Sequence, residues 1–156
     1  MMYISENYKY DTTTIPGIKM IDGYACGVED VNYEIEYGIN LSKCKGIAQD
    51  CFNYAVYLTS IILPEKINFI GSWAFAYTCI SSIILPNNLK NIYAYTFSFT
   101  DLTSITIPDS VKNIGQYAFI GSWQLSSIFI PSTIQYIGYS AFEWCPIESL
   151  PNSTTS

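Results

Sequence analysis

A block of 22 or 23 residues recurs along most of this chain. Its clearest marker is a proline that returns at regular intervals, at Pro64, Pro86, Pro108 and Pro131. The successive spacings are 22, 22 and 23 residues. A unit this short cannot enclose a hydrophobic core of its own, so it must bury its apolar face against neighbouring copies. The repeat therefore predicts a solenoid, a fold that presents extended surfaces for binding and rarely carries out chemistry.

Each copy begins with a short segment in which apolar and polar residues alternate. In the clearest copy, Ile105 and Ile107 alternate with Ser104 and Thr106, which is the two-residue period of a half-buried strand. The proline that follows lacks an N–H and belongs at a strand margin. We expect strands at residues 59–63, 81–85, 103–107 and 126–130. They should stack in parallel, about 4.8 Å apart.

The rest of each copy carries further positions that we expect to face inward. A phenylalanine closes the phrase, preceded by alanine or threonine, and we expect one tight helical turn there with its ring in the core. Glycine at 71, 115 and 138 indicates either a positive φ or crowding against the next coil, and Tyr93 departs from this rule in one coil. The expected core positions are Ile67, Leu89, Val111 and Ile134, then Ile70, Ile92, Ile114 and Ile137, then Phe75, Phe97, Phe119 and Phe142.

The N-terminal third carries weaker copies of the same phrase. Residues 47–52 repeat the spacing of residues 114–119, and a fainter copy lies at residues 15–26. We therefore divide the chain into degenerate N-terminal repeats with a cap at 1–57, four clear repeats with the start of a fifth at 58–151, and a polar tail at 152–156. No capping helix follows the last strand, which favours either a longer parent chain or a partner that covers this end.

Charge and hydropathy argue against several classes of partner. The net charge is −6, all seven basic residues are lysines, and there is no arginine or histidine. The lysines are not clustered along the sequence, so we expect neither nucleic acid nor an anionic membrane as partner. The sequence contains no stretch of 18 apolar residues, so we expect no membrane insertion. The first residues lack the charged start and apolar run of a signal peptide.

Catalytic and metal-binding patterns are missing from the sequence. Without histidine, Ser-His-Asp and Cys-His constellations are excluded, and no phosphate-binding glycine motif occurs. The five cysteines include no C-x-x-C pair, so we expect no metal and no cofactor. In the repeat register Cys26 falls at the position of Phe119 and Cys51 at that of Ala118, which predicts buried free thiols. Glu65 and Asp109 lie on turns without an expected pocket. We predict that the chain is not an enzyme.

Strand alternation points one row of side chains outward, on the side that we expect to be concave. Three of the four are apolar, and an exposed patch of a few hundred Å² often marks a contact site. The alternative, that isoleucine and phenylalanine merely follow strand propensity, stays open. The predicted partner-binding residues are Ile62, Ile84, Thr106 and Phe129, with Ser104 beside them.

A second candidate surface consists of aromatic residues on the expected convex side. Tyr54, Tyr77, Phe99 and Trp144 each lie two residues after a core phenylalanine, and Trp73, Tyr95 and Tyr117 precede the alanine or threonine. These rings form either a packed ladder that seals this side or a stripe that binds sugar or protein.

The phrase at residues 102–119, Leu-Thr-Ser-Ile-x-Ile-Pro-x-Ser-Val-x-x-Ile-Gly-x-x-Ala-Phe, resembles the BspA-type leucine-rich repeat. The resemblance is strong over residues 58–151 and weak over 10–57. That family typically carries cysteine three residues after the phenylalanine, and here only Cys145 keeps this offset. The resemblance implies a mainly β, right-handed leucine-rich-repeat solenoid, with a parallel sheet on the concave side and short turns or helical turns on the convex side. It also implies surface proteins that adhere to host molecules or other cells.

Two functions remain open at this point. The first is a non-catalytic binding or adhesion module that recognises a protein or glycan ligand through the concave sheet. The second is a structural assembly component of a virion, tail or fibre, docking through the sheet or the uncapped end as a homo-oligomer or larger assembly. The expected location is accordingly the cell surface, a secreted form or a virion.

Overall fold

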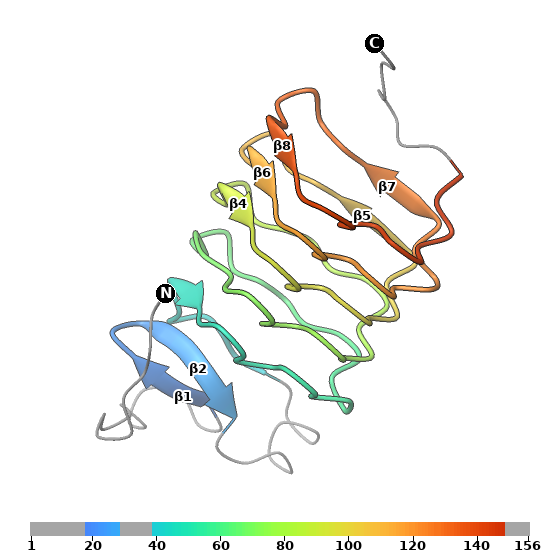
Figure 1. Cartoon of the computed structure of the whole chain (residues 1–156). Coiled ribbons are helices and arrows are strands. Elements are labelled where there is room, and N and C mark those ends of the chain that lie inside the picture. The colour runs from blue at the N-terminus through green and yellow to red at the C-terminus, as the bar shows by residue number, and fades with distance from the viewer. Residues whose placement is uncertain (1–17, 29–38, 149–156) are drawn as a thin grey trace.

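The computed structural model describes residues 18–28 and 39–148, and it shows a solenoid of stacked coils (Figure 1). No helix occurs among these described residues, so this part of the fold is built from short strands and turns. The strands are β1 (Ile18–Ile21), β2 (Tyr24–Val28), β3 (Gly46–Ile47), β4 (Asn91–Ile92), β5 (Ser104–Thr106), β6 (Asn113–Ile114), β7 (Ser127–Phe129) and β8 (Tyr136–Ile137). The predicted mainly β repeat fold is confirmed.

Parallel pairing holds successive coils in register. β5 pairs with β7, and Thr106 lies opposite Phe129. β6 pairs with both β4 and β8, which aligns Ile92, Ile114 and Ile137 in three neighbouring coils. Residues that pair across two coils are one repeat length apart in the sequence, as the proline spacing predicted.

Two of the four predicted strands are present as strands, and two are not. β5 and β7 lie within the predicted segments 103–107 and 126–130. Residues 81–85 keep the expected burial, with Ile83 and Leu85 buried and Ile84 exposed, whereas Ile61 and Leu63 are only half-buried. Neither 59–63 nor 81–85 forms a regular ladder. Their cross-coil bonds are at the start of the segment: Ser81 N donates to Thr59 O at 3.4 Å and Thr103 N to Ser81 O at 3.2 Å. These coils are held together mainly on the opposite wall. We call the face of these four segments the β5 face.

The opposite wall consists of turns, which we call the turn wall: residues 48–55, 71–78, 93–100, 115–122 and 138–145. In residues 115–122, every second backbone N–H donates to the next coil. The bonds run from Tyr117 N to Tyr139 O (3.0 Å), from Phe119 N to Ala141 O (2.8 Å) and from Gly121 N to Glu143 O (2.9 Å). The N–H groups between them donate within the coil, for instance Ala118 N to Gly115 O at 3.3 Å.

The tight helical turn predicted for this wall is therefore wrong. A helical turn would need right-handed backbone at consecutive residues, and two residues of each turn have a positive φ instead. The chain instead makes consecutive turns with left-handed backbone at Tyr117 (φ 57°) and Gly121 (φ 69°). This conformation turns alternate peptide groups toward the next coil, and it recurs at the equivalent positions along the solenoid.

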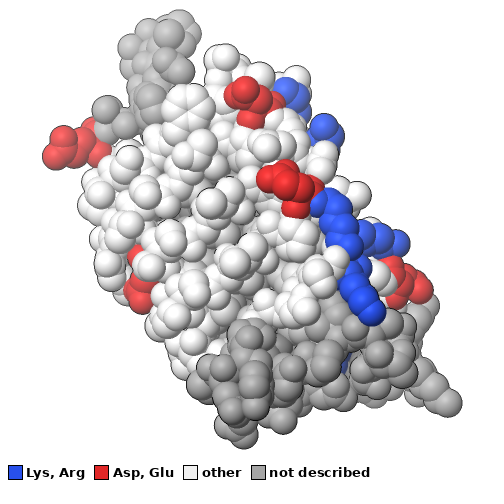
Figure 2. Space-filling view, turned by 180° about the vertical axis from the view of Figure 1, so that it is seen from behind, with Lys and Arg blue, Asp and Glu red and all other residues white. Residues whose placement is uncertain are grey.

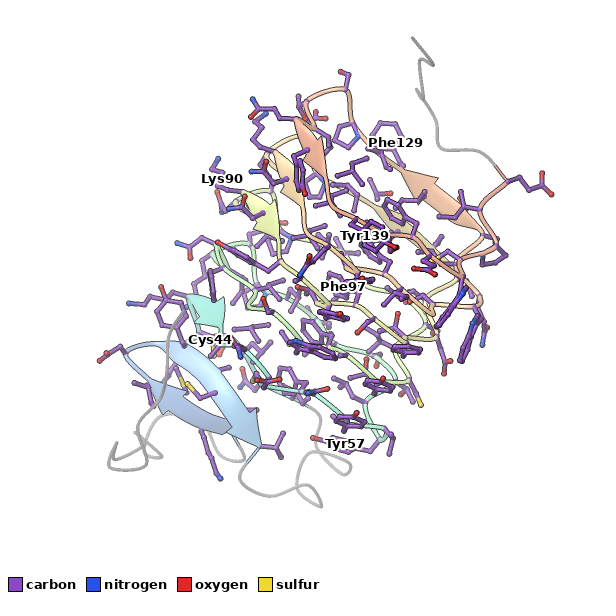
Figure 3. The ribbon with its side chains drawn as sticks, in the orientation of Figure 1. Cys44, Tyr57, Lys90, Phe97, Phe129 and Tyr139 are labelled. Atoms are coloured by element: carbon purple, nitrogen blue, oxygen red, sulfur yellow. The ribbon has the colours of Figure 1, made fainter. Side chains whose placement is uncertain are left out.

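The hydrophobic core lies between the two walls and is continuous along the solenoid (Figure 3). Its centre is a stack of phenylalanine rings, one per coil, and Phe97 is labelled within it. The predicted core positions of the inner coils are buried, whereas Phe142 and Ile134 are half-buried and Ile137 is exposed in the last described coil. The ring centroids of Phe52, Phe75, Phe97, Phe119 and Phe142 lie 5.4, 5.6, 5.4 and 5.3 Å apart.

The N-terminal part of the described chain is a hairpin and not a weak coil. β1 and β2 pair antiparallel around a turn in which Asp22 and Gly23 have positive φ. β2 then pairs in parallel with β3, with Ala25 beside Ile47. This register puts Cys26 beside Ala48 and not at the phenylalanine position that we predicted. Cys26 is half-buried, whereas Cys51 is buried as predicted.

Glycine follows the second core isoleucine of a coil, as Gly115 follows Ile114, because two coils approach closely there. A Cβ at Gly115 would lie 2.6 Å from Ala94 N and 2.7 Å from Tyr93 C, both backbone atoms of the preceding coil. Gly115 does not have a positive φ. Of the two predicted reasons for this glycine, crowding is the one that applies, and the crowding is against the coil before it.

We expect Phe119→Ala to lower the free energy of unfolding by roughly 3–5 kcal/mol, the range for deleting a buried aromatic side chain. Phe119 is fully buried between Phe97 and Phe142, so both neighbouring coils should lose packing. Urea denaturation measures the change, with Phe129→Ala as the control for loss of an exposed ring. A loss below about 1 kcal/mol would contradict the core position of Phe119.

Gly115→Ala should lower the free energy of unfolding by roughly 1–3 kcal/mol, because the new methyl group has no room unless the two coils separate. Gln116→Ala, at the exposed next residue, is the matched control. If thermal denaturation shows equal stability for both variants, the close approach of the coils is not a constraint on the fold.

Candidate binding surfaces

The five residues predicted to bind a partner lie together on the β5 face. Ile62 is 86% exposed, Ile84 84% and Phe129 55%. Ser104 and Thr106 are exposed beside them. The pairing of Thr106 with Phe129 continues through the cross-coil bonds between residues 59, 81 and 103, so these side chains follow one another along the solenoid. We call Ile62, Ile84, Thr106 and Phe129 the apolar row; Phe129 is labelled in Figure 3.

A row of serines runs beside the apolar row, and Ser104 alone among them was predicted to bind a partner. Because side chains two residues apart on a strand share a face, each serine lies next to a member of the apolar row. All four serines are exposed, and each hydroxyl can donate and accept hydrogen bonds. The sequence could have revealed this row, because a serine lies two residues before each member of the apolar row. The serine row is Ser60, Ser82, Ser104 and Ser127.

The β5 face carries no charged side chain in residues 59–63, 81–85, 103–107 or 126–130. Any ligand on it would be held by apolar contact and by hydroxyl hydrogen bonds. Such binding depends little on salt, because screening acts on charges. The β5 face is therefore suited to a neutral protein or sugar surface.

The aromatic candidates on the turn wall are packed against one another, as one of the two interpretations required. Tyr54 stacks on Tyr77 at 4.4 Å between ring centroids, and Tyr77 stacks on Phe99 at 4.6 Å. Trp144 does not continue the stack: it lies 6.5 Å from Phe99 at an angle of 60°. The reason is Gly121, which has no ring in the intervening coil and is covered by the Phe99 ring.

A second stack on the turn wall joins Trp73, Tyr95 and Tyr117, with centroid distances of 4.0 and 4.9 Å. Burial beside the neighbouring rings raises the pKa of the Tyr117 phenol, and burial followed by the charge of Tyr54 raises that of Tyr77. Both shifts fit rings that contact each other more than water. Among the predicted aromatic residues Tyr54 and Trp144 are exposed, at 63% and 58%. Two further exposed rings extend this surface: Trp123 contacts Phe99 edge-on, and Tyr139 contacts Tyr117 edge-on.

The described residues show no arrangement suited to catalysis. All five cysteines are free, and burial raises the pKa of the Cys44 and Cys145 thiols to about 11, which disfavours the reactive thiolate. No group of three or more His, Cys, Asp or Glu residues within 18–28 and 39–148 could hold a metal ion. Glu65 and Asp109 are exposed on separate turns.

Across the described part of the chain, no helix has the length and apolar character needed to cross a membrane.

Comparison with known proteins agrees with this geometry. Residues 38–155 match the family model described as the BspA type leucine rich repeat region, in six copies. No curated protein matches the chain. The crystal structure of the pneumococcal vaccine antigen PcpA is 28% identical over 69% of this chain and 29% of that chain, with a TM-score of 0.56. A leucine-rich repeat protein from Eubacterium ventriosum is 21% identical over 90% of this chain and 42% of that chain, with a TM-score of 0.60, a likeness of fold.

The chain spans less than half the length of either solved structure. The family match covers the coils from Ile39 onward, and the β1–β2 hairpin lies outside it. The repeat phrase, the parallel register and the family match agree, and the chain belongs to the BspA-type leucine-rich repeat family.

Proposed function

We propose that this chain is a non-catalytic binding or adhesion module that holds a neutral protein or glycan surface against the β5 face. The observation that carries the proposal is the exposure of Ile62 and Ile84, 86% and 84%, at matching positions of neighbouring coils. Isoleucine side chains this exposed gain nothing from the fold itself. A partner that covers them gains about 25 cal/mol per Å² of apolar surface, less the cost of association.

The serine row supports the same proposal. Hydroxyls beside an apolar strip allow a ligand to pair its own polar groups while its apolar groups are covered. Sugars and protein surfaces both offer this mixture. The uncharged face also gives no reason for a strongly charged ligand to bind there.

The similarity to PcpA supports a location outside the cell. PcpA is described as a vaccine antigen, and the shared repeat covers 69% of this chain. We place the present chain at a cell surface or in a secreted form, where an adhesive module meets its partner.

The alternative is an assembly component that uses the same face to bind a second copy. The observation in its favour is the lack of charge on the β5 face, because identical copies that meet face to face would otherwise repel through like charges. Measurement of oligomeric state therefore belongs to the same experiment.

We expect the double variant Ile84→Asp with Phe129→Asp to keep the fold and to lose binding or self-association. Both side chains are exposed, so the core is not altered, whereas two carboxylates on the apolar row oppose its burial. Screening on glycan and host-protein arrays measures binding, and light scattering measures self-association. Loss of binding with a monomeric parent chain favours the adhesive module, and loss of a defined oligomer favours the assembly component.

The matched control is Gln116→Asp with Gln124→Asp, which makes the same change of charge at exposed sites outside the β5 face. Circular dichroism and the denaturation midpoint establish that both variants are folded. If the folded Ile84 and Phe129 variant associates as tightly as the parent chain, the β5 face is not the binding surface.

A further inference from the structure

The lysines of this acidic protein lie mostly along one edge of the solenoid. Five of the six lysines in the described residues lie in the turns that lead into β3, into Ile70, into β4 and into β6. Figure 2 shows lysine side chains following one another along an edge, with acidic side chains beside some of them, next to a broad face with little charge. We call Lys43, Lys45, Lys66, Lys90 and Lys112 the lysine edge.

The expectation that the lysines are not clustered is therefore wrong. It was based on distance along the sequence, whereas residues one repeat apart are neighbours in a solenoid. Lys112 N donates to Lys90 O at 2.9 Å, and Asn68 N donates to Lys45 O at 3.0 Å. Each coil adds a step of roughly 4.8 Å, so the row runs along the solenoid axis.

The charge of the lysine edge is opposite to that of the rest of the molecule. Its turns contain two acids, Glu65 and Asp109, against five lysines. Asp22 adds a third acid beside the edge, because Lys45 N donates to the carbonyl of its neighbour Gly23 at 2.8 Å. Elsewhere in the described residues Lys19 is accompanied by four acids, at Asp50, Asp101, Glu143 and Glu148. The net charge of −6 thus conceals a basic strip, whose field attracts anions locally.

Several of these ammonium groups are free to meet a ligand. Lys43, Lys45, Lys66 and Lys90 are exposed, and Figure 3 shows Lys90 at the edge beside β4. Lys112 Nζ donates to the backbone carbonyl of Asp109 at 3.2 Å. Lys45 Nζ lies 4.9 Å from the centre of the Tyr24 ring, where an anion can still approach it.

Amide side chains stand between the lysines. Asn68 and Gln135 occupy the same column as Lys90 and Lys112, and Asn88 occupies that of Lys66. Asn113 Nδ2 donates to Asn91 Oδ1 at 2.8 Å on the next strand, which fixes the pair at the edge. Amides can donate to and accept from hydroxyls, and ammonium groups bind single anionic groups.

We propose that the lysine edge binds a linear glycan that carries sulfate or carboxylate groups, with the sugar chain lying along the solenoid axis. A sugar chain supplies hydroxyls for the amides and separated negative charges for the lysines. Nucleic acid fits less well, because no arginine is present for bidentate contacts with its phosphates and bases. This surface is separate from the uncharged β5 face.

The test measures binding of the whole chain to a heparin oligosaccharide and to hyaluronan, at low and at high salt. We expect binding to at least one of them at low salt, weakened as salt rises. Lys90→Gln with Lys112→Gln should weaken it by about tenfold, because two positive charges are lost from neighbouring coils of the edge. Lys90→Arg with Lys112→Arg keeps the charge and should bind nearly as well as the parent chain.

The matched control is Gln116→Glu with Gln124→Glu, which lowers the net charge by the same amount away from the lysine edge. Lys43→Gln with Lys66→Gln tests the second column independently, should Lys90→Gln with Lys112→Gln disturb the fold. Absence of binding to both glycans at low salt, or equal weakening in the control, would overturn the proposal. Tighter binding to a single-stranded oligonucleotide or to anionic phospholipid vesicles would also overturn it, in favour of that ligand.

Discussion

The backbone hydrogen bonds between coils on the turn wall are the interaction on which the rest of the fold depends. Alternate N–H groups can reach the next coil only if two residues per coil adopt left-handed backbone, and most of those residues are not glycine. Each left-handed residue costs roughly 1–2 kcal/mol. In this chain, aromatic rings occupy many of these positions and stack on each other, as Tyr54, Tyr77 and Phe99 do. The stacking offsets part of the strain, so the aromatic residues of the turn wall serve first to hold the coils in register.

The same wall explains why this chain can depart from the family pattern of cysteines. At the position three residues after the phenylalanine, Thr78, Thr100, Ser122 and Cys145 follow one another along the solenoid. Thr78 Oγ1 donates to Phe75 O at 2.8 Å, and Cys145 Sγ donates to Phe119 O at 3.1 Å. In these four coils a small side chain donates to a turn carbonyl, and a hydroxyl does this as a thiol does, whereas Ala55 fills the same position after Phe52 without a donor. Thr100 and Ser122 also bond to each other, at 3.0 Å, which links two coils inside the core.

The repeat pattern alone predicted the features that depend on periodicity, and missed those that depend on three-dimensional register or on local geometry. The buried Ile105 and Ile107, the phenylalanine stack and the exposed Ile62 and Ile84 all follow from the period of two within a strand and of 22 or 23 between strands. The β1–β2 hairpin was missed because the apolar pattern of a short segment does not distinguish a coil of the solenoid from a hairpin. The break in the aromatic stack at Gly121 and the lysine edge were missed for another reason. Each depends on what stands one repeat away, which is visible only when the copies are laid side by side.

Because successive coils are in register, side chains at the same position of each repeat form a row along the solenoid. A ligand would therefore contact rows of similar side chains. The apolar row, the serine row and the lysine edge all arise in this way, each from different positions of the repeated coil. None of them is a pocket, so no single residue determines affinity, and each further coil lengthens every row by about one strand spacing. Affinity for an extended ligand should therefore grow with the number of coils, because each coil repeats a weak contact at a fixed distance. The β5 face and the lysine edge differ in charge and use different positions of the coil, so the two ligands that we propose for them would not compete for the same side chains.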